Sequence, residues 1–193
     1  MTNPDDRLAE YLAGDLTRKH RKVLLRQELR RKIDDHGPGD SDNVVAEIIA
    51  YLRERTYLHV VAIFAALPGE VDLRSLPKAI GRVFVFPKVV ENHLVFFRVN
   101  SFEEDLELGA YGILEPKDGL EVVAVEKIDL FLCPGLGFDL KGGRVGRGKG
   151  YYDRVLEKAR AGAVKIGVCF GYQLVDEITM EEHDIRMNGV IAG

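Results

Sequence analysis

The stretch from Ile128 to Phe170 decides the fold. It reads IDLFLC at 128–133, PGLGFDLKGGRVGRGKG at 134–150, YYDRVLEKARA at 151–161 and VKIGVCF at 164–170. The first and last runs are short and apolar, as in strands covered on both faces, and the third follows a helical period. Strand, helix and strand at this spacing predict a βαβ unit with a right-handed crossover. We therefore expect an α/β fold, with an open, mostly parallel sheet flanked by helices on both faces in a Rossmann-like, three-layer arrangement.

Further elements of the same two kinds are predicted on the N-terminal side of this unit. They are helices over 5–35 with a bend at Gly14, from Ser41 or Asp42 onward and over 73–80, and strands over 58–66, 83–86 and 94–99. The helices follow from apolar residues spaced three or four positions apart, and a turn at Glu91-Asn92 separates the last two strands. The sequence contains no internal repeat and no linker, so we expect a single domain over residues 1–193.

The composition excludes several classes of protein. The chain has 193 residues, of which 46% are hydrophobic, and a net charge of −4, which disfavours a general polyanion binder. No apolar run approaches the roughly 20 residues that a membrane helix needs, and the N-terminus lacks the pattern of a secretory signal. We therefore expect a cytoplasmic protein with no membrane partner. Cys133 and Cys169 both lie in apolar runs, which predicts buried thiols rather than a disulfide or a metal cluster.

The segment before the predicted helix at 151–161 is rich in glycine and in cations. Glycine allows a backbone to turn its N–H groups inward and to approach a ligand closely, and the cations add positive charge, so the segment is suited to phosphate oxygens. The run GRVGRGKG at 143–150 nearly matches the phosphate-loop pattern G-x-x-x-x-G-K-[ST]. Gly150 has no hydroxyl for magnesium, but Asp153 can hold the metal instead. The alternative interpretation is a solvated basic loop.

Several separated motifs resemble one enzyme family. They are PGLGFD at 134–139, G-x-R-x-G-x-G-x-G-Y-Y-D at 142–153, K-x-x-x-R at 22–26, the segment 64–73 with Glu70, FPK at 86–88, YGILEP at 111–116 and EHD at 182–184. In this order they resemble the 5-formyltetrahydrofolate cyclo-ligases, also called methenyltetrahydrofolate synthetases. The resemblance extends over most of the chain.

The resemblance implies an activity and its cofactors. Members of the family use ATP and Mg²⁺ to convert 5-formyltetrahydrofolate to 5,10-methenyltetrahydrofolate, with release of ADP and phosphate. The formyl oxygen accepts the γ-phosphate, and nitrogen 10 then attacks the phosphorylated imine before phosphate leaves. Such a reaction needs mainly positioning and charge neutralisation. The implied partner is a small molecule, the folate with or without a polyglutamate tail, and we expect a monomer without a nucleic-acid partner.

The resemblance also assigns roles to single residues. Nucleotide contacts fall on Lys22, Arg26, Arg144, Val145, Gly146, Arg147, Gly148, Lys149, Gly150, Tyr151 and Tyr152. Folate contacts fall on Ala65, Glu70, Tyr111, Arg147, Gly148, Lys149, Gly150 and Tyr151. Arg147 and Lys149 are the implied catalytic residues, and Asp153 and Asp184 the implied magnesium ligands. Glu70 follows a long apolar run, and a fixed carboxylate there can pair with the N–H donors of a pterin. We assign no role to His20 or His183, because no histidine pair has metal-ligand spacing.

Two other functions are alternatives to this one. Nine basic or histidine positions between Arg18 and Lys32 favour a nucleic-acid-binding helix, although no aromatic residues are interleaved with them. The glycines at 146, 148 and 150 suggest a dinucleotide-binding oxidoreductase, but their spacing differs from G-x-G-x-x-G.

Overall fold

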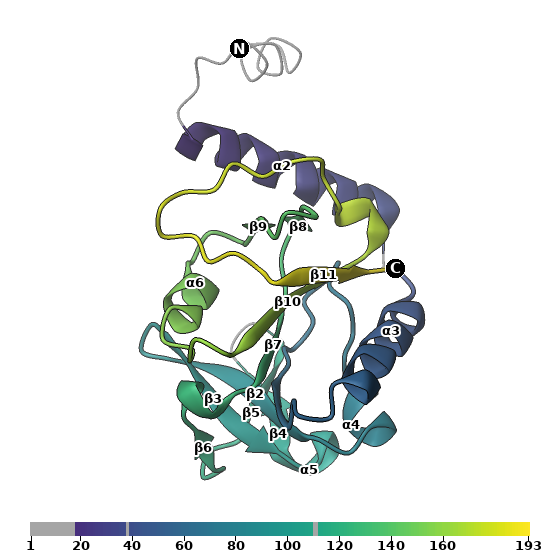
Figure 1. Ribbon diagram of the computed structural model, residues 1–193, viewed down its shortest axis with the longest axis vertical. Coiled ribbons are helices and arrows are strands. Elements are labelled where there is room, and N and C mark those ends of the chain that lie inside the picture. Colours follow the sequence, from purple (N-terminus) through teal and green to yellow (C-terminus); the bar gives the residue numbers. More distant parts are fainter. Residues whose placement is uncertain (1–17, 38, 110–111) are drawn as a thin grey trace.

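A seven-stranded sheet forms the centre of the computed structural model, which describes residues 18–37, 39–109 and 112–193 (Figure 1). The strands in spatial order are β11 (Gly189–Ala192), β10 (Val164–Cys169), β7 (Leu130–Cys133), β1 (Val60–Ala62), β2 (Val83–Val90), β3 (His93–Val99) and β6 (Val122–Val123). The pairs from β11 to β2 are parallel, and β3 and β6 are added antiparallel at one edge. The predicted mostly parallel sheet is confirmed, including the parallel pair β7–β10.

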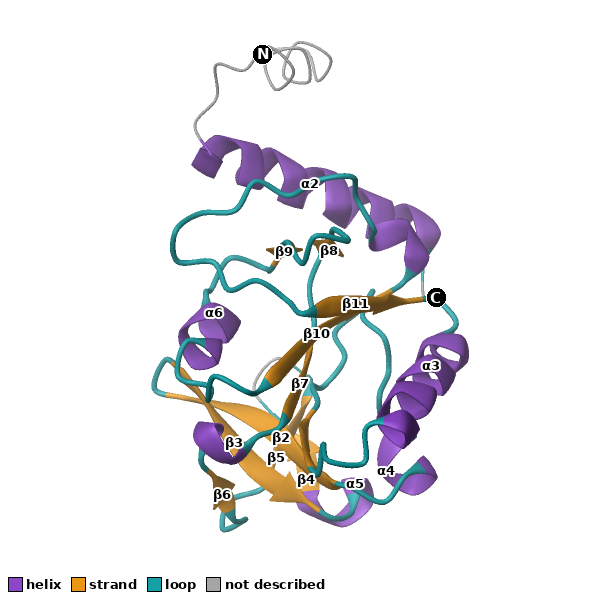
Figure 2. Cartoon of the chain, in the orientation of Figure 1, coloured by secondary structure: helices purple, strands orange, loops and turns teal. Residues whose placement is uncertain are grey.

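Helices cover both faces of this sheet (Figure 2). They are α3 (Ser41–Glu54), α4 (Leu76–Ala79) and α5 (Phe102–Asp105) on one face and α6 (Tyr151–Leu156) on the other, whereas α2 (Arg18–His36) packs in a separate cluster with Leu136 and Val145. Successive strand residues point to opposite faces. On β7, Leu130 and Leu132 therefore pack in the cluster that contains α3, whereas Phe131 and Cys133 pack in the cluster that contains α6. The two clusters are the two outer interfaces of the predicted three-layer arrangement.

Several elements differ from their predicted extents. The strand predicted over 58–66 is only the short β1, although Ile63 and Phe64 beyond it are buried. The helix predicted over 73–80 is reduced to α4, with Pro77 in its first turn, because proline has no N–H to continue the ladder. The helix predicted over 151–161 ends at Leu156. The first helix is described from Arg18, so its predicted start and the bend at Gly14 lie outside the described residues.

Elements that were not predicted include two small hairpins and the edge strand β11. One hairpin pairs β4 (Leu106–Leu108) with β5 (Leu114–Pro116), and the other pairs β8 (Gly137–Phe138) with β9 (Arg144–Val145). The second lies under α2, where Leu29 and Ile33 pack against Leu136 and Val145. A Cβ atom added to Gly137 would lie 2.6 Å from a methyl group of Leu29, so this glycine permits the close approach of α2.

Two further expectations concern the thiols and the membrane. Cys133 and Cys169 are free and buried, as predicted, and burial raises the pKa of each thiol to about 12. Among the described residues, none of the helices combines the length and the apolar character that crossing a bilayer requires.

Candidate functional site

The glycine-rich segment consists of two parts with different structures. In the first part, Asp139 is buried and fixes the turn between β8 and β9: its carboxylate accepts hydrogen bonds from the N–H groups of Lys141 (2.9 Å), Gly143 (2.7 Å) and Ile178 (2.7 Å). A Cβ atom on Gly142 would lie 2.2 Å from the carbonyl oxygen of Met187. The glycines of this turn therefore allow close packing and turn formation. The part of the segment that can bind phosphate is shorter than the sequence suggested.

The second part is the loop at 146–150, between β9 and α6. In the described part of the chain, the N–H groups of these five residues donate no hydrogen bond to any acceptor. Gly148 and Gly150 have φ values of +102° and +67°, which a glycine adopts without strain. Helix α2 contacts a carbonyl group of the loop, because Arg26 donates a hydrogen bond to the oxygen of Gly146 over 3.1 Å. The loop thus keeps a row of free donors, as an anion-binding loop requires.

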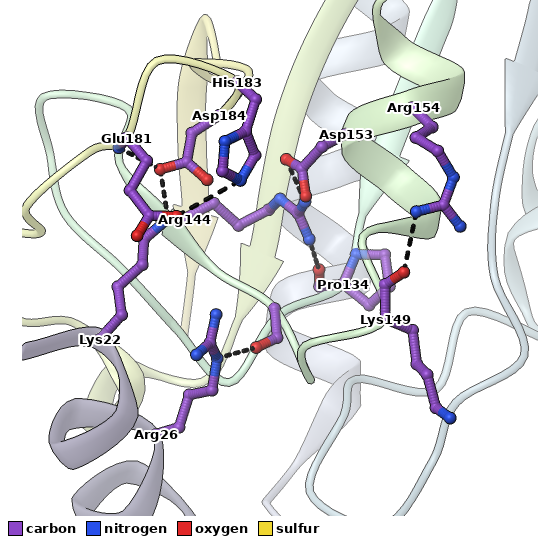
Figure 3. Close-up of polar contacts among 11 residues, drawn as sticks. Lys22, Arg26, Pro134, Arg144, Lys149, Asp153, Arg154, Glu181, His183 and Asp184 are labelled. Carbon is purple, nitrogen blue, oxygen red and sulfur yellow. Dashed lines mark hydrogen bonds and ion pairs between the residues drawn. The ribbon is translucent and has the colours of Figure 1, made fainter. Parts of the chain in front are cut away.

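Three ion pairs lie near this loop, and two of them join parts of the sequence that are far apart. Figure 3 shows the pairs made by Lys22 and by Arg144. Lys22 on α2 pairs with Asp184 and lies 3.8 Å from Glu181. Arg144 pairs with Asp153 over 2.8 Å, and Arg147 pairs with Glu70 over 3.0 Å. The structure therefore brings the predicted cations of α2 and the loop together with the predicted carboxylates.

Arg144 lies at the base of the site. It is 6% exposed, and its guanidinium donates to Asp153 (2.8 Å) and to the oxygen of Pro134 (3.3 Å). The same group lies 5.5 Å from the centroid of the Tyr152 ring, which gives a cation–π contact. Arg144 Nε and the Tyr152 hydroxyl are both buried and without a hydrogen-bond partner among the described residues. Burial raises the pKa of Tyr152, so this hydroxyl remains a neutral donor.

Glu70 lies in the segment that follows β1 and comes directly after Gly69, where an added Cβ atom would lie 2.2 Å from a side-chain carbon of Ile33 on α2. Its side chain is 6% exposed and accepts hydrogen bonds from the N–H of Leu67 (3.0 Å) and from Arg147 Nε (3.0 Å). Burial raises the pKa of Glu70, and the Leu67 N–H and the Arg147 charge oppose this rise. Ala65 is half-buried and packs against the cluster that contains α3, and Tyr111 lies outside the described residues.

A cavity of about 280 Å³ opens beside the loop. It is lined by Gly148, Lys149, Gly150, Asp153, Arg154, Glu157 and His183. His183 belongs to a second group: one ligand atom each from Glu181, His183 and Asp184 lie within 4.8 Å of one another. Of the two predicted magnesium ligands, Asp153 lines this cavity, whereas Asp184 belongs to the group formed with Glu181 and His183.

Sequence reasoning missed five residues of this region. They are Asp139, Arg154, Glu157, Glu181 and, as a lining residue, His183. Only Asp139 carries a local signal, because an aspartate three residues before a Gly-Gly pair favours an Asx turn. The others have no sequence pattern of their own, since their neighbours in space come from other elements.

Comparison with known proteins decides the family. The sequence model of the 5-formyltetrahydrofolate cyclo-ligase family matches residues 17–193. The chain belongs to this family. It is therefore an enzyme of the ligase class, and the resemblance proposed from the motifs is confirmed.

Individual relatives agree with this family and with its fold. The 5-formyltetrahydrofolate cyclo-ligase of Saccharomyces cerevisiae is 32% identical over 203 residues, covering 89% of this chain and 95% of the yeast protein. The enzyme of the same name from Mus musculus is 29% identical, covering 88% and 90%. The solved 5,10-methenyltetrahydrofolate synthetase of Aquifex aeolicus superimposes with a TM-score of 0.72 at 32% identity, covering 89% of each chain.

Proposed function

We propose that this protein converts 5-formyltetrahydrofolate to 5,10-methenyltetrahydrofolate in a reaction that consumes ATP, requires Mg²⁺ and releases ADP and phosphate. One observation carries the proposal: in a chain of this family, the loop at 146–150 has free N–H groups and accepts a hydrogen bond from Arg26, while Arg144 and Lys22 form buried pairs with the carboxylates of Asp153 and Asp184. We further propose a cytoplasmic monomer that accepts the folate with or without a polyglutamate tail.

The residues around the loop fit a nucleoside triphosphate. Free backbone donors and several guanidinium and ammonium groups complement phosphate oxygens, and the buried Arg144 Nε has a hydrogen-bonding capacity that the described residues leave unused. In our proposal the nucleotide is held by Lys22, Arg26, the backbone and side chains of 144–150, Tyr151 and Tyr152. Lys22 is buried in its pair with Asp184, and Arg26 donates to the loop, so the basic face of α2 offers less support for nucleic-acid binding than the sequence suggested.

The carboxylates fit a hard divalent cation. Mg²⁺ prefers oxygen ligands and is usually held by one or two carboxylates together with substrate phosphates. Asp153 and Asp184 are the proposed ligands, and both now pair with cations, Arg144 and Lys22. When bound, the metal supplies positive charge beside the phosphates.

Glu70 is the proposed anchor for the folate. Its carboxylate is held in place by the N–H of Leu67 and reached by Arg147 from the loop, so a pterin bound there lies next to the phosphate-binding backbone. Ala65, Tyr111 and residues 147–151 complete the proposed folate contacts. The folate site and the phosphate-binding loop are thus neighbours in our proposal. Transfer of phosphate to the formyl oxygen needs this proximity, because the two reacting groups must approach within van der Waals distance.

Lys149 and Arg147 are the proposed catalytic residues. Lys149 lines the cavity, and no carboxylate among the described residues lies within ion-pair distance of its ammonium group. It is therefore available to neutralise the charge that develops during phosphoryl transfer, as preorganised cations do. Arg147 links the loop to Glu70 and so places a second cation between the two substrates.

A spectroscopic assay tests the proposed function. The protein is mixed with 5-formyltetrahydrofolate, Mg²⁺ and ATP, and the ultraviolet band of the methenyl product is followed over time. We expect the band to appear only when both ATP and Mg²⁺ are present, with one ADP formed per product. No band in the complete mixture, or an equal band without ATP, contradicts the proposal.

A further inference from the structure

The carbonyl groups of the loop at 146–150 are held by guanidinium groups. Three of them accept hydrogen bonds: Gly146 from Arg26 (3.1 Å), Arg147 from Arg30 (3.4 Å) and Lys149 from Arg154 (3.0 Å). In a planar trans peptide the C=O and the following N–H point in opposite directions. Each arginine that holds a carbonyl therefore also fixes the direction of the next N–H group.

Arg154 differs from the other two because it comes from α6, on the far side of the loop from α2. Its second guanidinium nitrogen donates to the oxygen of Asn92 over 3.1 Å, at the turn of the β2–β3 hairpin. Its Cζ atom lies 5.3 Å from the centroid of the Tyr151 ring. Figure 3 shows the guanidinium of Arg154 directed at the backbone of Lys149, whose side chain extends away from this contact.

These contacts make Arg154 a brace between the loop and a hairpin that belongs to the central sheet. The hairpin strands β2 and β3 pair along seven registered positions, so the turn at Asn92 is a firm support. The lone arginine spans from this support to the peptide that links Lys149 to Gly150. Gly150 has φ +67°, and it has no side chain that could make a contact to hold that conformation.

From this geometry we propose that Arg154 is a positioning residue for the nucleotide loop. By fixing the Lys149 carbonyl it directs the Gly150 N–H toward the cavity and holds the backbone from which the Lys149 side chain extends. By stacking on Tyr151 it holds the residue that follows. The inference rests on the proposed function for its kinetic consequences, whereas the bracing of the loop is a property of the protein alone.

Kinetics in saturating 5-formyltetrahydrofolate test the consequence for the nucleotide. In Arg154→Lys the charge remains, but an ammonium group cannot reach both carbonyls as the planar fork does. We expect both Arg154→Lys and Arg154→Met to lower kcat/KM for MgATP about tenfold, the effect of losing hydrogen bonds from a charged donor, while the KM for folate changes less than about twofold. Lys158→Met, which removes a nearby cation of the same segment, is the control and should match the wild type.

Two kinetic results overturn the proposal. Full activity in Arg154→Lys means that charge alone suffices and that the two-carbonyl brace does not matter. An equal rise of KM for both substrates means that the substitution acts through general loss of structure.

Limited trypsin digestion tests the brace without any substrate. The loop carries two cleavage sites, after Arg147 and Lys149, and native-state cleavage reports how often a segment opens. We expect Arg154→Met to be cut at these sites about tenfold faster than the wild type and Lys158→Met to be cut at the wild-type rate, with the cut sites identified by mass spectrometry. Unchanged cleavage in Arg154→Met overturns the inference, even if the protein uses ATP. A wild-type protein that forms no product refutes the proposed function, and the digestion still decides on Arg154.

Discussion

Replacing Lys22 by methionine tests the most buried ion pair among the described residues. The exposed fractions are 4% for the Lys22 side chain and 8% for that of Asp184. Removing one partner of such a pair leaves the other charge buried and unpaired, which costs about 3–5 kcal/mol. Asp184 also accepts the N–H of Glu181, and this contact survives the substitution, so we expect the lower end, about 3 kcal/mol. For a chain of this size that corresponds to a fall in Tm of roughly 6–12 °C.

Urea unfolding followed by circular dichroism measures this loss. Lys32→Met is the matched control on the same helix, because its pair with Glu28 has side chains that are 39% and 45% exposed. An exposed i,i+4 pair contributes about 0.3–0.5 kcal/mol, so the control should lose no more than that. The double variant Lys22→Met/Asp184→Asn should recover part of the loss, since no buried charge is left unpaired. A loss in Lys22→Met no larger than that in the control refutes the reasoning.

Magnesium connects this experiment to the proposed function. If Asp184 is a metal ligand, Mg²⁺ should stabilise Lys22→Met more than the wild type, because in the wild type Lys22 competes for the carboxylate. At a tenfold excess over its Kd, a bound cation raises the free energy of unfolding by about 1.4 kcal/mol. If Mg²⁺ raises the free energy of unfolding equally in the two proteins, the result counts against Asp184 as a ligand.

Four further predictions follow from the site and its packing. Lys149→Ala should lower kcat about a hundredfold in the methenyl assay, and near-normal turnover removes Lys149 from the mechanism. Asp153→Asn should raise the Mg²⁺ concentration needed for half-maximal activity, and an unchanged requirement speaks against the metal assignment. Burial raises the pKa of Glu70 above its ordinary 4.5, so its ionisation destabilises the folded protein as the pH rises above that value. In urea unfolding, Glu70→Gln should therefore gain stability relative to the wild type between pH 4.5 and 7, and a difference that is constant with pH contradicts the cause. Gly137→Ala should lose about 1–3 kcal/mol in thermal unfolding, because its Cβ would lie 2.6 Å from Leu29, and an unchanged Tm shows that α2 shifts freely.

The central fold could be predicted because its signals are local. The runs at 128–133 and 164–170 are apolar throughout, and such runs belong to strands covered on both faces. The same signal overestimated the strand at 58–66, because hydrophobicity reports burial rather than ladder pairing: Phe64 is 3% exposed yet lies beyond β1. The hairpin β8–β9 was missed since its strands are two residues each and contain glycine and arginine.

The site was predictable only in part, because its contacts join residues far apart in the sequence. Lys22 and Asp184 are separated by 162 positions, and each looks like surface charge among its own neighbours. Only the resemblance to a family placed them in one site. Neither the sequence pattern nor the family resemblance indicated a role for Arg154. It lies outside the motifs that carry the resemblance, and its partners are backbone oxygens, which every residue offers.

The three ion pairs of the site share one property under the proposed function. In each pair a proposed phosphate-binding cation meets a proposed metal- or folate-binding carboxylate: Lys22 with Asp184, Arg144 with Asp153, and Arg147 with Glu70. For the two pairs that contain a proposed metal ligand, Lys22–Asp184 and Arg144–Asp153, a ligand of one charge sign satisfies one partner and leaves the other unpaired, which is unfavourable because these side chains are largely buried. Phosphate and metal arriving together satisfy both partners at once. The pairing thus favours the magnesium complex of ATP over either component alone. In calorimetric titrations with and without Mg²⁺, the affinity for ATP should therefore differ far more than charge screening explains.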